Sequence, residues 1–253
     1  YGGAVYFASG CSNSQFINCT FENNNAADGG AVYASSNGQR LNFINCTFKY
    51  NNADTDGGAV HLHQNNQYTK FLNCTFIKNY ANRYGGAVAF LDNGLQRGIN
   101  FTDCKFYNNT VKSDASSGSY HFGGAIYLAN MAANCVIFNC NFSGSYALLG
   151  GAVYLGPARV NNVRPSIKID DCLFVDNHAT DARNGGGAIF FTCYETPHLD
   201  YGTVISDSDF INNTAYAGAA INWSDFEDGT LRNCTFINNT AYLRAGAVFL
   251  YQG

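Results

Sequence analysis

"NCTFENNNAADGGAV" occupies residues 18–32, and "NCTFKYNNADTDGGAV" follows at residues 45–60 with almost the same letters. Each stretch joins a signature centred on a phenylalanine to a second signature, GGAV. Variants of GGAV begin at Gly2, Gly29, Gly57, Gly85, Gly123, Gly150, Gly186, Gly218 and Ala245. The phenylalanines are Phe21, Phe48, Phe76, Phe106, Phe142, Phe174, Phe210 and Phe236. A repeat of roughly 27 residues that recurs eight times along the chain is typical of a solenoid.

Two short strands and a bend are predicted in every repeat. After each GG, β-branched residues such as Val32 alternate with outward-facing residues, and this period of two indicates a strand. In the signature centred on the phenylalanine, the Cys and the Phe share a face, whereas an apolar residue three positions before the Cys has the opposite parity. The chain must therefore bend immediately before the Cys, where Asn and Asp tolerate left-handed backbone. The bend residues are Asn18, Asn45, Asn73, Asp103, Asn139, Asp171, Asp207 and Asn233.

Two further corners complete the predicted coil. An Asn three residues after almost every Phe is expected to form a ladder of side-chain amides at the second corner. The GG pair is expected at the third corner. Because Ala219 and Ala245 each replace one glycine of the pair, we expect that positive φ is not obligatory there and that close packing matters more.

These patterns predict an all-β fold, a right-handed parallel β-helix of about eight turns of roughly 27 residues. Residues 1–253 form one segment, expected to be part of a longer surface protein. Three corner insertions are predicted at residues 112–122, 156–166 and 192–202. A propeller blade or a leucine-rich repeat fits the period and the spacing less well.

The composition excludes several classes of partner. The formal charge is −4, and no window is apolar over the length of a transmembrane helix. We therefore expect no nucleic-acid binding and no membrane insertion, and we expect no cofactor. Seven of the ten cysteines lie in one column, where parallel Cβ vectors disfavour disulfides. Free, buried thiols are the favoured interpretation, with metal binding as the alternative.

The pairing of GGA(I/V/L) with FxxN resembles the repeats of chlamydial polymorphic outer-membrane proteins. The phrase "NCTFINNTAY" at residues 233–242, followed by "AGAV", is similar to adhesin-like surface proteins of methanogenic archaea. This resemblance implies an extracellular, cell-surface β-helix without catalytic activity. The implied partners are a glycan or protein on another cell and neighbouring domains of the same chain. A purely structural stalk is the alternative.

An enzyme is the hypothesis from another class, because polysaccharide lyases and hydrolases also use this fold. Such chemistry needs clustered carboxylates with a nearby Lys or Arg. The candidates are Asp170 and Asp171, then Asp207 and Asp209 one turn later, with Lys168 nearby. The simpler interpretation is that Asp171 and Asp207 occupy the Asx bend, so no catalytic residue is assigned.

Two groups of residues are candidates for binding. The first is an outward aromatic stripe, which could bind a partner or could instead be stacked or covered. Its members are Tyr6, Tyr33, Tyr127, Tyr154, Phe190 and Phe249. The second group belongs to the later insertions, since loops leaving a solenoid often carry function: Arg159, Arg164, Tyr194 and His198. Among ten NxS/T sequons, the favoured glycan acceptors are Asn108, Asn212 and Asn238.

Overall fold

The computed structural model describes residues 1–91, 98–112, 121–128, 134–156, 167–181, 185–192, 202–224 and 229–251. All 33 regular elements in these ranges are β-strands. Within the same ranges we find no helix with the length and apolar character needed to cross a membrane. Most of the insertions predicted at 112–122, 156–166 and 192–202 lies outside the described residues, as do Arg159, Arg164, Tyr194 and His198.

The strands form four parallel sheets, which we call A to D in the order in which the chain visits them. Sheet A contains β1 (Val5–Phe7), β5 (Val32–Ala34), β9 (Val60–His63), β13 (Val88–Leu91), β17 (Ile126–Leu128), β21 (Val153–Leu155), β25 (Ile189–Phe191), β29 (Ile221–Ser224) and β33 (Val248–Tyr251). Sheet B contains β2 (Gln15–Ile17), β6 (Asn42–Ile44), β10 (Lys70–Leu72), β14 (Asn100–Thr102), β18 (Cys135–Phe138), β22 (Ile167–Asp170), β26 (Val204–Ser206) and β30 (Thr230–Arg232).

Sheets C and D follow after the next two corners. Sheet C contains β3 (Thr20–Glu22), β7 (Thr47–Lys49), β11 (Thr75–Ile77), β15 (Lys105–Tyr107), β19 (Asn141–Ser143), β23 (Leu173–Val175), β27 (Asp209–Ile211) and β31 (Thr235–Ile237). Sheet D contains β4 (Asn25–Ala26), β8 (Asn52–Ala53), β12 (Tyr80–Ala81), β16 (Thr110–Val111), β20 (Tyr146–Ala147), β24 (His178–Ala179), β28 (Thr214–Ala217) and β32 (Thr240–Arg244). Sheet D was not anticipated as a strand, although its inward alanines were visible as a repeated small residue.

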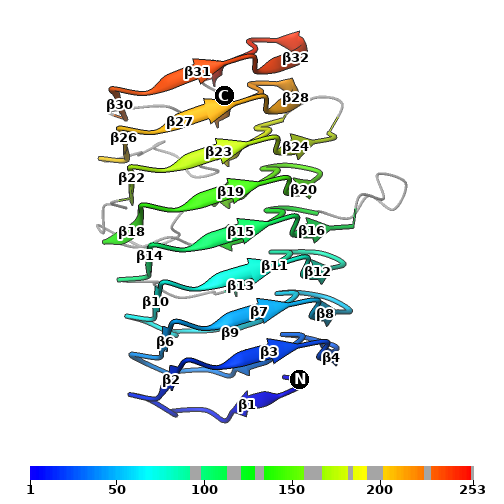
Figure 1. Ribbon diagram of the computed structural model, residues 1–253, viewed down its shortest axis with the longest axis vertical. Coiled ribbons are helices and arrows are strands. Elements are labelled where there is room, and N and C mark those ends of the chain that lie inside the picture. Colours follow the sequence, from blue (N-terminus) through cyan, green and yellow to red (C-terminus); the bar gives the residue numbers. More distant parts are fainter. Residues whose placement is uncertain are drawn as a thin grey trace.

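Each strand pairs with its equivalent one repeat earlier and one repeat later, so the chain coils into a right-handed parallel β-helix. Eight strands in each of three sheets, and nine in sheet A, correspond to eight coils and one further strand. Figure 1 shows these coils stacked along the long axis, with the N-terminus in the coil at one end. The predicted fold class is confirmed.

The interior consists of columns of apolar side chains, and the column of sheet C is phenylalanine in every coil. The phenylalanines of sheet C stack with ring centroids 4.7–5.1 Å apart, from Phe21 to Phe236. A second column in sheet B begins with Phe16 and Phe43, and its rings meet the first column edge-on, as Phe43 meets Phe48 at 5.7 Å. Offset stacking and edge contacts are the favoured aromatic geometries. The repetition in the sequence therefore builds the core directly.

The three predicted corners are confirmed. All eight Asx bend residues have φ between 49° and 55°, which is the left-handed region that Asn and Asp tolerate. At the second corner, the Oδ1 atom of Asn79 accepts hydrogen bonds from the backbone N–H and the side-chain amide of Asn51 at 3.1 and 2.9 Å. The Nδ2 atom of Asn79 donates to the carbonyl oxygen of Phe48 at 3.0 Å. The buried amides thus satisfy backbone groups that the corner leaves unpaired.

The prediction that positive φ is dispensable at the first position of the GG pair is wrong. All eight glycines there have φ between 57° and 72°, and Ala245 adopts φ 45° as well. The second glycine is required for space instead: a Cβ on Gly58 would lie 2.0 Å from the carbonyl oxygen of Gly86 in the next coil. Ala219 occupies this second position beside a register shift between Ala215 and Ala217.

Candidate functional site

The outer face of sheet A carries the predicted aromatic stripe. Each stripe residue lies closest to the residue that precedes the GG pair of the coil before it, as the ring of Tyr127 lies 4.4 Å from that of Tyr84, and these two outer columns form one surface along the rod. From Tyr84 to Phe190 the surface is apolar, and it contains a buried cluster separate from the interior. Ring centroids are 5.1 Å apart between Tyr127 and Tyr154, and 4.5 Å apart between Tyr154 and Phe122.

Burial of this stripe favours the stacked or covered alternative over a solvent-facing contact surface. Tyr33, Tyr127, Tyr154 and Phe190 have exposed fractions of 7%, 8%, 3% and 4%. Tyr127, Tyr154 and Phe190 pack in one buried cluster with Phe122, which belongs to the column of residues that precede the GG pairs. Only the members in the terminal coils reach solvent: Tyr6 is 54% exposed and Phe249 is partly exposed. The middle of the stripe therefore contributes to stability, as the covered alternative anticipated.

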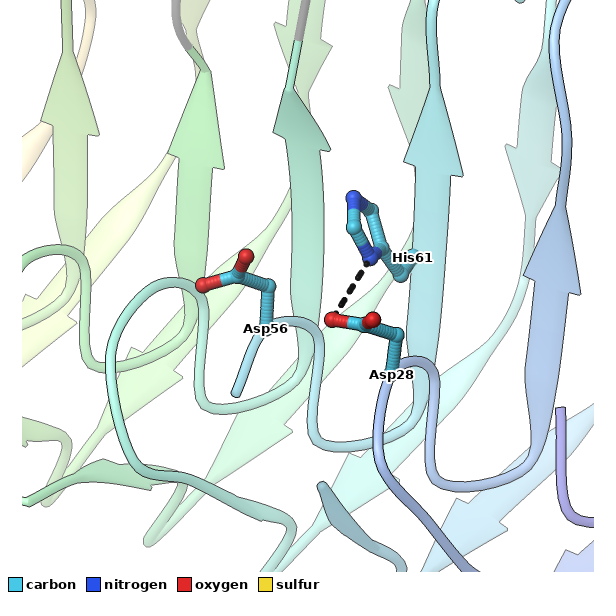
Figure 2. Close-up of side chains that lie close together, drawn as sticks. All are labelled: Asp28, Asp56 and His61. Carbon is cyan, nitrogen blue, oxygen red and sulfur yellow. Dashed lines mark ion pairs between the residues drawn. The ribbon is translucent and has the colours of Figure 1, made fainter. Parts of the chain in front are cut away.

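Toward the N-terminus the same two columns become polar. Asp28 and Asp56 precede the GG pairs of successive coils, and His61 lies on β9 beside Tyr33. Figure 2 shows the carboxylates on successive bends, with the His61 ring directed at Asp28. Nδ1 of His61 lies 3.5 Å from Oδ1 of Asp28. One ligand atom from each of the three residues falls within 4.8 Å of the others.

Arg83 and Thr55 hold the two carboxylates of this cluster. Arg83 donates from Nε to Oδ1 of Asp56 at 2.9 Å and from Nη2 to Oδ2 at 2.5 Å. Its guanidinium also lies 4.9 Å from the centroid of the Tyr84 ring. The hydroxyl of Thr55 donates to Asp28. Burial raises the pKa of Asp28, but the His61 ring and the Thr55 hydroxyl outweigh it and lower this pKa to about 2.

Sequence reasoning missed the Asp28, Asp56 and His61 cluster as a site. The signal was present in the sequence, because two successive repeats place Asp before GG, and His61 occupies the stripe position that follows Asp56. The carboxylates that were considered instead do not form such a cluster. Asp171 and Asp207 occupy the bend, with φ of 54° and 50°. Asp170 pairs with Lys168 at 2.7 Å and accepts a hydrogen bond from Ser206.

A groove runs along the Asx bend between sheets B and C. Its volume is about 690 Å³, and it crosses five successive coils. The bend residues that line it are Asn45, Asn73, Asp103, Asn139 and Asp171. Nδ2 of Asn73 donates to Oδ1 of Asn45 at 2.9 Å, and Nδ2 of Asn139 donates to Oδ1 of Asp103 at 2.7 Å.

Other residues of this groove add further chemistry. Lys105 supplies an amine, while Leu72 and Leu173 supply apolar surface. Oδ1 of Asn141, also in the lining, is buried and has no hydrogen-bond partner. The groove therefore combines amides, carboxylates and a cation with apolar patches, along a line parallel to the rod.

The predicted glycan acceptors share one corner. Asn108, Asn212 and Asn238 each precede the buried amide ladder, adopt φ between 51° and 55°, and are exposed. Their side chains are accessible, and glycosylation stays a prediction that the intact mass of the protein from its native host would test.

The cysteine column lies in the interior. All nine described cysteines are free, and those of the middle coils are buried. The thiols donate weak hydrogen bonds to carbonyl oxygens, as Cys104 does to Thr102 at 3.3 Å. Burial raises the pKa of Cys135 to about 11, which keeps that thiol protonated at neutral pH. These properties agree with small apolar packing residues.

Comparison with known proteins supports the architecture. Residues 2–125 match the family model described as "Right handed beta helix region". No curated protein is significantly similar to this chain.

Proposed function

We propose that this β-helix is a non-catalytic segment of an extracellular, cell-surface adhesin that attaches to a glycan or protein on another cell. The observation that carries this proposal is the groove along the Asx bend. It is a continuous surface of mixed polar and apolar side chains that spans five coils, on a rod whose interior contains the core side chains.

The chemistry of the groove suits carbohydrate hydroxyl groups. Amides such as those of Asn73 and Asn139 can donate and accept hydrogen bonds, and the carboxylates of Asp103 and Asp171 accept them. Leu72 offers an apolar edge for the C–H face of a sugar ring. Because coils repeat about every 4.8 Å, an extended chain lying along the rod meets equivalent groups at each step.

The sequence resemblance supports the same proposal independently. GGA(I/V/L) and FxxN repeats resemble those of chlamydial surface proteins, and "NCTFINNTAY" is similar to adhesin-like proteins of methanogenic archaea. Neighbouring domains of a longer chain are the proposed additional partners.

The test is binding of the 253-residue chain to a glycan array and to whole cells. Asn73→Gly and Asn139→Gly delete groove amides while keeping a residue that accepts positive φ. Asn233→Gly is the matched control, because Asn233 has the same bend geometry and lies outside the groove lining. We expect weaker binding by the two groove variants and unchanged binding by the control. Equal binding by all three would remove the groove from the proposal.

A structural stalk is the second candidate. The continuous inner columns favour it, since stacked coils alone make a rigid spacer. A well-folded chain that binds neither cells nor glycans would favour the stalk over the adhesin.

A polysaccharide lyase or hydrolase is the third candidate. The paired carboxylates of Asp28 and Asp56, with Arg83 beside them, are the observation in its favour. However, Asp56 is buried, so its carboxylate is not accessible to a polysaccharide. Incubation with acidic polysaccharides, followed by assays for new reducing ends and unsaturated products, would reveal such an activity.

A further inference from the structure

His61 is a buried imidazole whose ionic contact to Asp28 is too long to be a good hydrogen bond. Its exposed fraction is 3%, and neither Nδ1 nor Nε2 makes a hydrogen bond. Buried polar atoms in folded proteins almost always have a partner, so each exception calls for an explanation such as a bound ion. The ring points into the space beside two carboxylates (Figure 2).

The separations around His61 fit coordination better than hydrogen bonding. The 3.5 Å between Nδ1 of His61 and Oδ1 of Asp28 is long for a hydrogen bond. Two ligand atoms bound at about 2.1 Å in a tetrahedral zinc site are about 3.4 Å apart. Asp56 completes a set of three ligand atoms that lie within 4.8 Å of one another.

The carboxylates are oriented by groups that leave room for an ion. Thr55 donates to one oxygen of Asp28, while Arg83 donates to both oxygens of Asp56. A carboxylate offers about four lone-pair directions, so each retains capacity for a metal. Ligating carboxylates commonly accept such supporting hydrogen bonds. Asp28 and Arg83 have side chains 19% and 49% exposed, which opens the cluster to solvent on that side.

We infer that Asp28, Asp56 and His61 form a binding site for a divalent first-row transition ion, with Zn²⁺ as the representative. The imidazole nitrogen favours such an ion over Mg²⁺ or Ca²⁺, which prefer oxygen ligands alone. Three protein ligands leave a fourth position for water. The bound ion joins two neighbouring coils, since Asp28 precedes β5 whereas Asp56 and His61 belong to the coil of β9. This inference does not depend on adhesion.

The experiment is titration of the metal-free chain, kept reduced, with Zn²⁺ by calorimetry and with Co²⁺ by visible spectroscopy. We expect one site per chain and a Co²⁺ absorption band of four-coordinate intensity, without a thiolate-to-metal charge-transfer band. Saturation with Zn²⁺ should raise the melting temperature, because the ion binds only the folded state.

The variants separate this site from other metal-binding groups. His61→Asn and Asp28→Asn should each weaken binding by roughly tenfold or more. His121→Asn is the matched control: His121 is also buried with Nε2 unpaired, but it is not part of a described metal-binding cluster. Its binding should equal that of the parent chain. Circular dichroism before titration confirms that each variant is folded.

Three outcomes would overturn the inference. They are absence of saturable binding, equal affinity in folded His61→Asn, and a charge-transfer band assigning the ion to cysteines. Should both ligand variants unfold, Asp28→Glu provides the remaining comparison, because it keeps the charge and displaces the oxygen. Unchanged Co²⁺ spectrum and affinity in Asp28→Glu would also contradict the inference.

Discussion

The interior of the coil and the outer face of sheet A are built on the same repeat, yet they vary in opposite ways. Inside, phenylalanine recurs at one position in all eight coils, from Phe21 to Phe236. Outside, the position before the GG pair changes from Asp28 and Asp56 to Tyr84 and Phe122. Both kinds of side chain meet their neighbours in the coils above and below. An inner side chain is also enclosed by the facing columns of the core, whereas an outer one is not. Chemistry specific to this protein therefore collects on the outer columns.

The largest loss of stability is expected from a cavity in the inner phenylalanine column. Phe76 is fully buried and stacks on Phe48 and Phe106 at 4.8 and 4.7 Å. Phe76→Ala should lower the free energy of unfolding by about 3 to 5 kcal/mol, because the stacked coils cannot collapse around the lost ring. Urea denaturation measures the effect. Leu72→Ala, at a site 41% exposed in the same coil, should change stability little.

The outer apolar cluster should respond more moderately. Tyr154 contacts Phe122, Tyr127 and Phe190, but the cluster has solvent on its far side. Tyr154→Ala should cost about 2 to 3 kcal/mol, measured by the same denaturation. Tyr6→Ala removes an exposed member of the same column and should cost less than about 1 kcal/mol. Equal losses at the two positions would contradict the buried assignment of the middle coils.

The amide ladder can be tested with one substitution expected to destabilise the protein and one expected to stabilise it. Asn79→Ala removes the acceptor for Asn51 and a donor to Phe48, and it should cost about 2 kcal/mol through buried groups left unpaired. Ser145 breaks the ladder naturally, and its Oγ has no partner. Ser145→Asn should therefore stabilise the protein by about 1 kcal/mol. Thermal unfolding of both variants measures the opposite shifts in melting temperature. Destabilisation by Ser145→Asn as well as by Asn79→Ala would contradict the stabilising role of the ladder.

A glycine in place of Ala245 at the last GGAV corner should stabilise the protein. Ala245 adopts φ 45°, where a Cβ is strained, while the other coils have glycine. Ala245→Gly should raise the free energy of unfolding by about 0.5 kcal/mol, the strain relief less the entropy of glycine. A chemical denaturation midpoint is precise enough to detect this change. Gly123→Ala, with φ 68°, is the opposite control and should destabilise.

The smallest expected effect is a pH dependence on the outer side of sheet D. Burial lowers the pKa of His178, whose ring stacks on Tyr146 at 5.3 Å. The unfolded chain therefore takes up the proton first as pH falls. Stability from the neutral ring is complete above the unfolded pKa of about 6.5 and decreases as pH falls toward the folded pKa. His178→Gln should flatten this decrease in denaturation midpoints compared between about pH 7.5 and about pH 5.

The architecture was predictable from the sequence because each inner column keeps apolar residues at a fixed period, and the column of sheet C is phenylalanine throughout. The Asx bends and the amide ladder followed for the same reason. Sheet D was missed because its strands are often two residues long and contribute only a small inward residue such as Ala81. The requirement at Ala245 was misjudged because a substituted residue can still be held in a left-handed conformation by the coil around it.

The candidate site was less predictable than the fold. Alternation correctly indicated that Tyr127 and Tyr154 point out of the coil, but it contains no information about what covers them. The cluster of Asp28, Asp56 and His61 depends on contacts between the edge of one coil and the strand of the next. Predicting such contacts requires knowing how two columns are aligned with each other along the rod. The period of a single residue type does not give that alignment.

The interruption at Ser145 has a mechanical consequence. Between neighbouring coils, the backbone N–H and the side-chain amide of Asn79 donate two hydrogen bonds to Asn109. A third hydrogen bond runs from the side-chain amide of Asn109 to the carbonyl oxygen of Phe76. None of these is present between Asn109 and Ser145, although both residues are described. Under a pulling force along the rod, the halves on either side of this joint would separate before the coils within each half come apart.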